Sequence, residues 1–377
     1  MERRALLAAF ASFGVFWGCW AAVLPAVQRA AHVSDGRLGL ALGALALSAV
    51  PVMPVAGRLA DRLGPRRTVP AGLTMFALVL ALPGLAHSLP ALLGCLVGLG
   101  ITTGALDVTI NTAAAGWERA EGDRLMSTAH GAFSVGVLAG SAAAGFARQL
   151  GAAPLAILLP VAVLVLVVAA TQPAYRSRPT GAVTRTGRRL PLALLAFGVL
   201  TAGAFLVEDG VISWSALHLE RGLGAAPAVS GLGPGLFAGA MAVGRLSGDR
   251  ISRRLSDAVV LAGAAGLASV GVIVLVLAPD PVVALGGLVV AGAGTSVLAP
   301  VLYSAVGARA AEGRQGADLA TATAIGYVGF VTGPPLVGFV SAATSLPVAL
   351  AGLAGVGLLL AVTGPLLLRG RSGRMPA

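Results

Sequence analysis

The sequence has little charge and no lysine. Only 11% of its 377 residues are charged, against about 25% in soluble domains. Hydrophobic residues make up 57% of the chain, and the mean hydropathy is +0.90. Apolar runs close to the ~20 residues that a helix needs to cross a bilayer recur throughout. These features exclude a soluble globular domain and predict an all-α polytopic membrane protein.

Cysteines and cofactor motifs are also scarce. Cys19 and Cys95 both lie inside apolar runs, which excludes a secreted disulfide framework, and nothing resembles a metal-ligand spacing. We expect both to be buried as small hydrophobic side chains. The sequence contains no phosphate-binding Gly-x-x-x-x-Gly-Lys-Ser/Thr loop, and no spacing suggests a Ser/His/Asp nucleophile. It therefore predicts no enzyme, no cofactor, no metal and no direct use of ATP.

The basic residues are 26 arginines, and the net charge is +11. This charge is compatible with nucleic-acid binding, but the arginines stand in the gaps between apolar runs and form no basic face. We interpret them as topology signals and expect no nucleic-acid partner. With a cytoplasmic N-terminus, only Arg29, Arg37, Arg148 and Arg221 fall on the outer side. The positive-inside rule therefore predicts a cytoplasmic (inner) membrane protein with both termini cytoplasmic.

Polar breaks divide the chain into twelve expected transmembrane helices. They span residues 5–27, 37–57, 68–87, 89–116, 126–147 and 153–172 in the first half, and 190–218, 226–246, 257–278, 281–307, 317–340 and 346–368 in the second. The first run follows Arg3 and Arg4 without a cleavage site, so we expect a retained helix rather than a signal peptide. The expected domains are an N-terminal six-helix bundle (1–173), a cytoplasmic linker (174–189) and a C-terminal six-helix bundle (190–377).

Short patterns recur at corresponding places in the two halves. The matching sets are Gly136 and Gly140 with Gly329 and Gly333, Gly98-Leu-Gly100 with Gly292-Ala-Gly294, and Trp20 with Trp214. Small residues four apart let helix backbones approach closely in lipid, and such contacts could also serve as sliding surfaces. Duplicated six-helix halves are typical of secondary transporters, whose substrate site lies between the halves near mid-membrane.

A basic stretch with one acid separates the second and third expected helices. It reads Gly57-Arg-Leu-Ala-Asp61-Arg62-Leu-Gly64-Pro-Arg66-Arg67, and it is expected to be a loop that begins where a helix ends in Gly-Arg-Leu. A related stretch, Gly244-Arg-Leu-Ser-Gly-Asp249-Arg250-Ile-Ser-Arg-Arg254, follows the eighth expected helix.

With these residues the chain resembles the major facilitator superfamily. Gly57, Asp61, Arg62, Gly64, Arg66 and Arg67 match its signature Gly-x-x-x-Asp-Arg/Lys-x-Gly-x-Arg/Lys-Arg/Lys between helices 2 and 3, and the second copy is degenerate. The resemblance covers the whole chain. It implies a fold of twelve transmembrane helices in two pseudo-symmetric six-helix bundles, a monomer in the lipid bilayer, and a small-molecule substrate.

Further motifs resemble a bacterial inner-membrane branch loosely related to sugar permeases. They are Ala105-Leu-Asp107-Val-Thr-Ile-Asn111, Met126-Ser-Thr-Ala-His130-Gly131, Glu208 with Trp214-Ser215, and Gly326-Tyr327-Val-Gly-Phe-Val-Thr-Gly333-Pro-Pro335. Drug–proton antiporters usually carry an arginine in helix 4 and a Gly-Pro pair in helix 5. Both are missing here, which disfavours drug efflux.

Three acids lie inside expected spans, namely Asp107, Glu208 and Asp209. An ionisable group at mid-membrane costs about 2.5–3.5 kcal/mol on insertion scales, so it is expected to face a cavity or a partner. Asp107 lies near the midplane and shares a helix face with Thr103 and Asn111. This polar stripe is either a proton-coupling or substrate site, or a structural hydrogen-bond network between helices.

The two acids of the second half, one histidine and four aromatic residues complete the candidate site. Glu208 and Asp209 point about 100° apart on a helix, so we favour Glu208 for the cavity, while Asp209 could cap a break at Gly210 or partner another helix. His130 is either a proton relay with Asp107 or a structural group. Tyr303 and Tyr327 could bind a polar solute. Trp20 and Trp214 are either site residues or interfacial anchors.

The function expected from these residues is proton-coupled transport of a small polar organic solute. The alternatives are a proton-antiport exporter of a metabolite or antimicrobial compound, and a membrane receptor that transports nothing. We expect Asp61 to gate the cytoplasmic side by meeting the positive N-terminal end of a neighbouring helix, such as that over 317–340. The arginines of the basic stretch are expected to pair with Glu118, Glu121 or Asp123.

Overall fold

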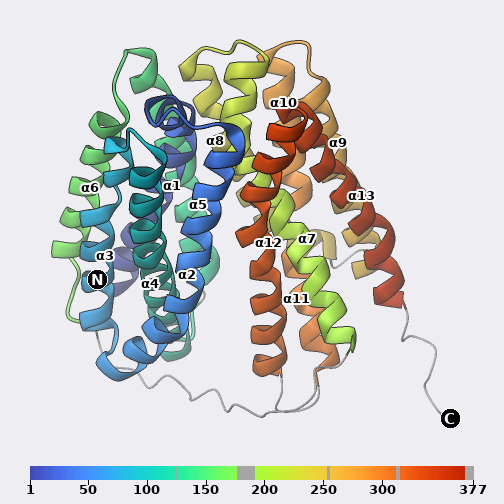
Figure 1. The fold of residues 1–377 in the computed structure, drawn as a ribbon. Helices are drawn as coiled ribbons and strands as arrows, with labels where there is room; N and C mark the ends of the chain where they lie inside the picture. Colours follow the sequence, from blue (N-terminus) through green and yellow to red (C-terminus); the bar gives the residue numbers. More distant parts are fainter. Residues whose placement is uncertain (124, 176–191, 253–254, 311–314, 370–377) are drawn as a thin grey trace. The chain divides into compact units, whose positions relative to one another are not determined.

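The computed structural model describes residues 1–123, 125–175, 192–252, 255–310 and 315–369, without the side chains of 248–252, 315–317, 320 and 369. These residues form helices and no strands (Figure 1). The helices are α1 (Glu2–Ala30), α2 (Asp35–Leu63), α3 (Pro65–Val79), η1 (Leu82–Leu85), α4 (Leu89–Glu121), α5 (Met126–Gln149), α6 (Pro154–Ala170), α7 (Leu192–Leu217), η2 (His218–Gly222), α8 (Pro227–Ser252), α9 (Asp257–Leu277), α10 (Pro281–Thr295), α11 (Leu298–Arg309), α12 (Gln315–Ala343) and α13 (Leu346–Arg369).

All twelve expected spans coincide with helices. In the described residues, eleven helices are long and apolar enough to cross a membrane, and the shorter apolar α6 is the twelfth. The span expected over 281–307 is divided into α10 and α11 at Ser296 and Val297. α4 continues to Glu121, beyond its expected end, and stops where Gly122 adopts a φ of 70°. The all-helical fold was therefore correctly predicted, while helix ends moved by a few residues.

The chain folds into two compact units. Unit 1 comprises Met1–Gly181 and Ser215–Gly235, and unit 2 comprises Ala182–Trp214 and Leu236–Ala377. Two unit boundaries therefore lie inside helices. One falls between Trp214 and Ser215 in α7, and the other between Gly235 and Leu236 in α8. The domain boundaries expected from sequence, at 173 and 190, stay a prediction. The expected linker, 174–189, lies outside the described residues except for its first two positions.

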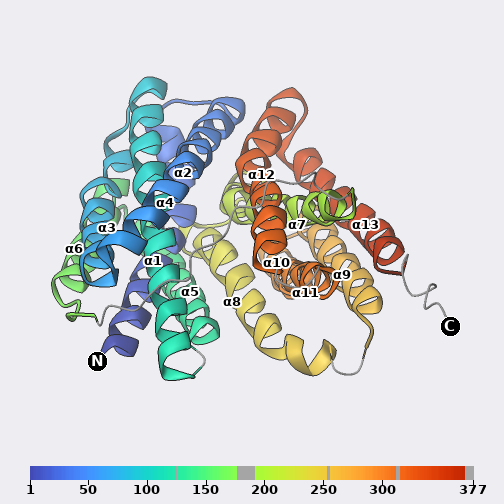
Figure 2. The same cartoon turned by 90° about the horizontal axis from the view of Figure 1, so that it is seen from below.

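Unit 1 is held together by close contacts between glycines and neighbouring backbones. In both views α1–α6 gather into one bundle (Figures 1 and 2), with α1 packed on α5 and α2 on α4. A methyl group added at Gly136 would overlap the carbonyl oxygen of Ala11, and one at Gly140 would overlap that of Val15. Gly100 likewise has no room for a side chain against Leu45 in α2. The predicted close approach of helices at these glycines is confirmed.

Unit 2 repeats this pattern. A methyl group at Gly329 in α12 would overlap the carbonyl oxygen of Ala202 in α7, and one at Gly292 in α10 would overlap that of Phe237 in α8. The sequence match aligns Gly292 with Gly98. In the structure, however, Gly292 contacts α8 in the way that Gly100 contacts α2. The repeat found in the sequence is therefore present in the packing, but the glycine match is shifted by two residues.

The basic stretch between the second and third spans is not a loop. α2 continues through Gly57, Asp61 and Arg62 to Leu63, and α3 begins at Pro65. The only non-helical residue between them is Gly64, with a φ of 71° that favours glycine. The second copy behaves similarly, because α8 continues to Ser252. The expectation that a helix ends at Gly-Arg-Leu was therefore wrong in both halves, since glycine is tolerated inside helices when neighbouring elements stabilise them.

Candidate functional site

Asp107 lies near the middle of α4 and forms a polar pair with Asn111. The Nδ2 atom of Asn111 donates to Oδ1 of Asp107 at 3.0 Å and to its backbone carbonyl at 2.9 Å. One turn earlier, the hydroxyl of Thr103 is buried and has no hydrogen-bond partner in the described part of the chain. The predicted stripe of Thr103, Asp107 and Asn111 is thus present, and one buried polar group in it remains available.

His130 lies in the first turns of α5, where its ring meets that of Phe10 in α1. The ring centroids are 5.4 Å apart at an interplanar angle of 73°, an edge-to-face contact. This exposed histidine therefore contacts an aromatic ring of α1. A proton relay from His130 to Asp107 stays a prediction.

In unit 2, Glu208 is paired with Arg245, an arginine of the second basic stretch for which the sequence indicated no such partner. Nη2 of Arg245 in α8 lies 3.4 Å from Oε1 of Glu208 in α7. Asp209 accepts a hydrogen bond of 3.4 Å from Oγ of Ser213 one turn later. The helix continues through Gly210, so the alternative that Asp209 caps a break there was wrong. Two acids and one arginine thus form a charged cluster inside unit 2.

The two candidate tyrosines lie against an aromatic group. The ring centroid of Phe205 in α7 is 6.5 Å from that of Tyr303 in α11 and 6.1 Å from that of Tyr327 in α12, and it stacks on Phe330 at 4.3 Å. Phe205 precedes Glu208 and Asp209 by about one helical turn. The aromatic group and the charged cluster are therefore neighbours on α7.

Trp20 and Trp214 are core residues in this structure. Trp20 is 2% exposed and stacks on Phe16 at 6.4 Å, and Trp214 is fully buried. The indole nitrogen of Trp214 donates to the carbonyl of Pro334 in α12 at 3.2 Å. An interfacial anchor keeps its polar edge in contact with the headgroup region, so this interpretation does not fit either tryptophan. Their role in substrate binding stays a prediction.

The signature residues of α2 and α3 lie at the surface of unit 1. Asp61, Arg62, Arg66 and Arg67 are exposed. Glu118, an expected partner of these arginines, instead accepts from the backbone nitrogens of Leu125 and Met126 at 2.6 and 2.7 Å and thereby caps α5. The gating role of Gly57, Asp61, Arg62, Gly64, Arg66 and Arg67 stays a prediction. The side chains of Asp249 and Arg250 lie outside the described residues.

Tyr175, just after α6, lies beside this signature. It lines a small pocket with residues of α2, α3 and α4, namely Ala60, Pro65, Thr68, Thr109, Thr112, Ala113 and Gly116. Its hydroxyl donates to Oε1 of Gln172. Burial, and secondly the carboxylate of Glu2, raises the pKa of Tyr175 above its ordinary value of 10.0. The start of the expected linker is therefore docked on unit 1.

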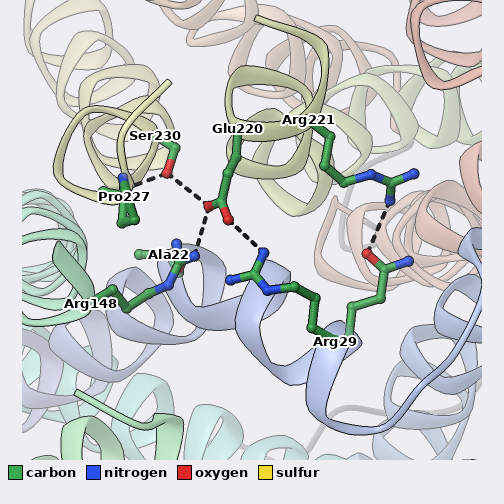
Figure 3. A network of polar contacts seen from close by, with 8 residues as sticks. Ala22, Arg29, Arg148, Glu220, Arg221, Pro227 and Ser230 are labelled. Carbon is green, nitrogen blue, oxygen red and sulfur yellow. Dashed lines mark hydrogen bonds and ion pairs between the residues drawn. The ribbon is translucent and has the colours of Figure 1, made fainter. Parts of the chain in front are cut away.

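A network of ion pairs that sequence reasoning missed lies where α1 ends and α2 begins. Figure 3 shows Arg29 of α1 and Arg148 of α5 converging on Glu220 of η2. Nη1 of Arg29 is 2.6 Å from Oε1 of Glu220, and Nη2 of Arg148 is 2.7 Å from Oε2. The side chain of Arg148 is only 3% exposed, and its Nη1 donates to the carbonyl of Ala22 at 2.8 Å. Glu220 thus neutralises a buried arginine.

The next residue of η2 extends the network toward α2. Nη1 of Arg221 lies 2.6 Å from Oδ1 of Asp35, the first residue of α2, and 3.1 Å from Oε1 of Gln28. Nε2 of Gln28 in turn donates to Oδ1 of Asp35 at 2.7 Å. η2 is one π-helical turn, a conformation often found at functional sites. Adjacent residues of this turn therefore reach partners on α1, α2 and α5.

A signal for this network was present in the sequence. Three of the four arginines assigned to the outer side, Arg29, Arg148 and Arg221, belong to it. The topology interpretation assigns them no partner, although Asp35 and Glu220 stand at the same expected side of the membrane. Opposite charges at the ends of several spans indicate an ion-pair network, but the pairing itself requires the fold.

The family model of the Major Facilitator Superfamily matches residues 5–310 and, separately, 197–376. The chain belongs to the Major Facilitator Superfamily. Among curated relatives, this superfamily member is 31% identical over 346 residues to an uncharacterised MFS-type transporter of Yersinia pestis, covering 90% of this chain and 89% of the relative. It is therefore a membrane transporter and not an enzyme.

Solved structures show the same fold at low sequence identity. The nucleoside transporter NupG matches with a TM-score of 0.76 at 12% identity, over 98% of this chain and 99% of that one. A D-xylose–proton symporter matches with a TM-score of 0.70 at 15% identity, over 97% of each chain. These similarities establish the superfamily fold, and the expectation of that fold from sequence is confirmed.

Proposed function

We propose that this transporter moves a small polar organic solute across the cytoplasmic membrane by alternating access, coupled to protons. The observation that carries the proposal is the Asp107–Asn111 pair inside α4, accompanied by the buried hydroxyl of Thr103, which has no hydrogen-bond partner among the residues that the structure describes. A carboxyl group and an amide provide donors and acceptors for a polar solute. The hydroxyl of Thr103 adds a further group that a bound solute would satisfy, since buried polar groups are normally hydrogen-bonded.

The charged cluster of unit 2 supports coupling to protons. Glu208 meets its arginine partner at a long distance, 3.4 Å, and within the described residues Asp209 accepts from the hydroxyl of Ser213 at the same distance. Two adjacent acids with one arginine leave an excess of negative charge inside a membrane helix. Such an excess is costly in an apolar environment and is relieved by taking up a proton. We assign proton coupling to Asp107 and Glu208.

A neutral solute of sugar or nucleoside type is our first candidate. Two proteins with the same fold are a nucleoside transporter and a D-xylose–proton symporter, and both solutes combine hydroxyl groups with an apolar face. The aromatic group of Phe205, Tyr303 and Tyr327 would provide the flat apolar wall that such solutes pack against. The arginine distribution supports cytoplasmic termini, and we expect the monomer to be the functional form.

The proposal is tested in two steps. First, a thermal-shift screen of pentoses, hexoses and nucleosides on the purified protein identifies a solute that stabilises it. Second, proteoliposomes with an internal pH dye report proton movement when that solute is added. We expect solute-dependent proton movement in the wild type and its loss in Asp107→Asn/Glu208→Gln. The exposed Asp257 in the first turn of α9 provides the matched control, Asp257→Asn, which should keep wild-type coupling.

Two outcomes would contradict the assignment. Wild-type coupling in the double variant would exclude Asp107 and Glu208 as proton carriers. Solute uptake that leaves the internal pH unchanged in the wild type would exclude proton coupling altogether. The sign of the pH change relative to the solute flux distinguishes symport from antiport export.

A further inference from the structure

The Glu208–Arg245 pair of unit 2 is open to solvent although it lies within membrane-spanning helices. Glu208 lies inside α7 and Arg245 inside α8, and both helices are long and apolar enough to cross a membrane. The side chain of Arg245 is 36% exposed and that of Glu208 is 15% exposed. Charged side chains of such helices face a partner or a water-filled cavity rather than lipid. The exposed part of this pair therefore faces water, from which a polar solute can reach it.

The two charged groups of this pair are only loosely bound to each other. Nη2 of Arg245 and Oε1 of Glu208 are 3.4 Å apart, whereas a hydrogen bond between such ions is normally about 2.7–2.9 Å long. Within the described residues, neither side chain forms another hydrogen bond. A guanidinium offers about five N–H donors and a carboxylate about four acceptor sites. Most of the hydrogen-bonding capacity of the pair is therefore left for water or for a ligand.

An aromatic wall, formed by the rings of Phe205, Tyr303, Tyr327 and Phe330, adjoins the pair. Phe205 precedes Glu208 by about one helical turn, so both lie on one face of α7. Phe205 stacks on Phe330 at 4.3 Å, and the rings of Tyr327 and Tyr303 meet it edge-on at 6.1 and 6.5 Å. Tyr303 also lies close enough to Glu208 for the two side chains to interact electrostatically. The wall therefore extends from the apolar part of α7 to the charged pair.

A carboxylate next to a guanidinium suits two adjacent hydroxyl groups better than it suits an ion. Each hydroxyl group can donate a hydrogen bond to Glu208 and accept one from Arg245, so a vicinal diol uses both members of the pair. An anionic group would compete with Glu208 for Arg245, and a cationic group would compete with Arg245 for Glu208. Either ion would leave one charge of the pair without its partner, which is costly inside a membrane protein. The pair therefore favours an uncharged ligand.

We propose that Glu208 and Arg245 together bind a vicinal diol of the transported solute. The aromatic wall packs against the apolar face of the same solute, and the diol fixes its orientation on that wall. The inference rests on the proposed function, and it narrows the solute from neutral polar molecules to those with two adjacent hydroxyl groups. Pentoses and ribonucleosides have such a diol, whereas 2′-deoxyribonucleosides lack it. Arg245 thereby becomes a residue that determines specificity.

Matched ligand pairs test the diol site on the purified full-length protein. Uridine and adenosine are compared with their 2′-deoxy analogues, and methyl β-D-xylopyranoside is compared with its 3-deoxy analogue, by titration calorimetry and thermal shift. We expect at least one of the three diols to bind, and its deoxy analogue to bind roughly tenfold or more weakly. The reason is that a missing hydroxyl leaves polar groups of the site unpaired. Equal affinity within a pair, or binding of none of the diols, overturns the proposal.

Variants then assign the diol preference to the pair. Arg245→Gln and Glu208→Gln should each weaken binding of the diol roughly tenfold or more and change binding of its deoxy analogue little, so the preference disappears. General damage to the fold would weaken both ligands alike. Arg37→Gln removes an exposed arginine of unit 1 that makes no ion pair within the described residues, and it should keep the full preference.

The results separate this inference from the proposed function. A wild-type preference that persists in both Arg245→Gln and Glu208→Gln overturns the diol site, even where solute-dependent proton movement is intact. A diol preference that both variants abolish supports the site, even where no proton movement accompanies the solute. In that case only the proposed proton coupling fails.

Discussion

Arg148 and Glu220 are 72 residues apart in the sequence and form a 2.7 Å ion pair around a guanidinium that is almost completely buried. The arginine comes from the last turn of α5, and the carboxylate comes from the π-helical turn that follows α7. Membrane helices rarely bury an arginine unless it is paired. This relationship ties the charged end of α5 to the turn η2.

Arg148 and Arg29 are expected to differ strongly in their effect on stability, although both pair with Glu220. Arg148→Met removes the buried guanidinium with its bonds to Glu220 and to the carbonyl of Ala22, and should reduce the free energy of unfolding by about 1.5–3 kcal/mol. Arg29→Met removes an exposed partner and should cost about 1 kcal/mol or less. Thermal unfolding of the purified variants in detergent measures this difference. Equal losses would mean that the burial of Arg148 is not retained in solution.

Gly136 and Gly131 lie on the same helix but in different environments. Gly136→Ala places a methyl group on the carbonyl oxygen of Ala11, so we expect a loss of about 1–3 kcal/mol or failure to fold. Nothing lies within 4 Å of a methyl group at Gly131, so Gly131→Ala should be neutral or stabilise by up to about 1 kcal/mol through helix propensity. Expression level and thermal unfolding distinguish the two. A Gly136→Ala protein as stable as the wild type would refute the close contact of α1 with α5.

Tyr175 gives a prediction for alkaline pH. Because its pKa is raised in the folded protein, the unfolded chain loses the phenol proton first as the pH rises. The contribution of Tyr175 to the free energy of unfolding is therefore fully present below the ordinary pKa of tyrosine. Above that pH the contribution decreases by at most about 1.4 kcal/mol per pH unit. Tyr175→Phe keeps the packing and removes this titration. Unfolding measured from about pH 8 to about pH 11 should therefore show a steeper loss in the wild type than in Tyr175→Phe. Parallel curves would contradict the burial of this phenol.

Asp61 is expected to keep the cytoplasmic side closed. Asp61→Asn should then favour the inward-open state, because the asparagine no longer carries the negative charge that the N-terminal end of a helix attracts. A membrane-impermeant maleimide applied from the cytoplasmic side should label Thr112→Cys faster when Asp61→Asn is added, in a Cys19→Ala/Cys95→Ala background. Asp257→Asn, the neutralisation of another exposed acid, should change nothing. An unchanged rate in Asp61→Asn would exclude the proposed gate.

Composition, hydropathy and glycine spacing were sufficient to predict the helices and several of their close contacts. Twelve apolar spans follow from the requirement that backbone groups be satisfied inside lipid, which only helices and closed barrels meet. The glycine contacts of α5 with α1 and of α12 with α7 were predictable because close approach depends on the local absence of side chains. The pairing of Asn111 with Asp107 was predictable too, since residues four apart in a helix are neighbours.

Only the tertiary structure decided which charges meet. The sequence places Arg29, Arg148 and Arg221 at span ends, but the packing of α1, α2 and α5 around η2 decides their partners. Arg245 meets Glu208 for the same reason, across two helices. The continuous helix through Gly57 and Asp61 also depended on packing, because glycine inside a helix is decided by its neighbours rather than by its propensity. Two charges form an ion pair when the fold brings them within a few ångströms. A sequence pattern gives such distances only between residues of the same helix, so it does not show which charges of different helices meet.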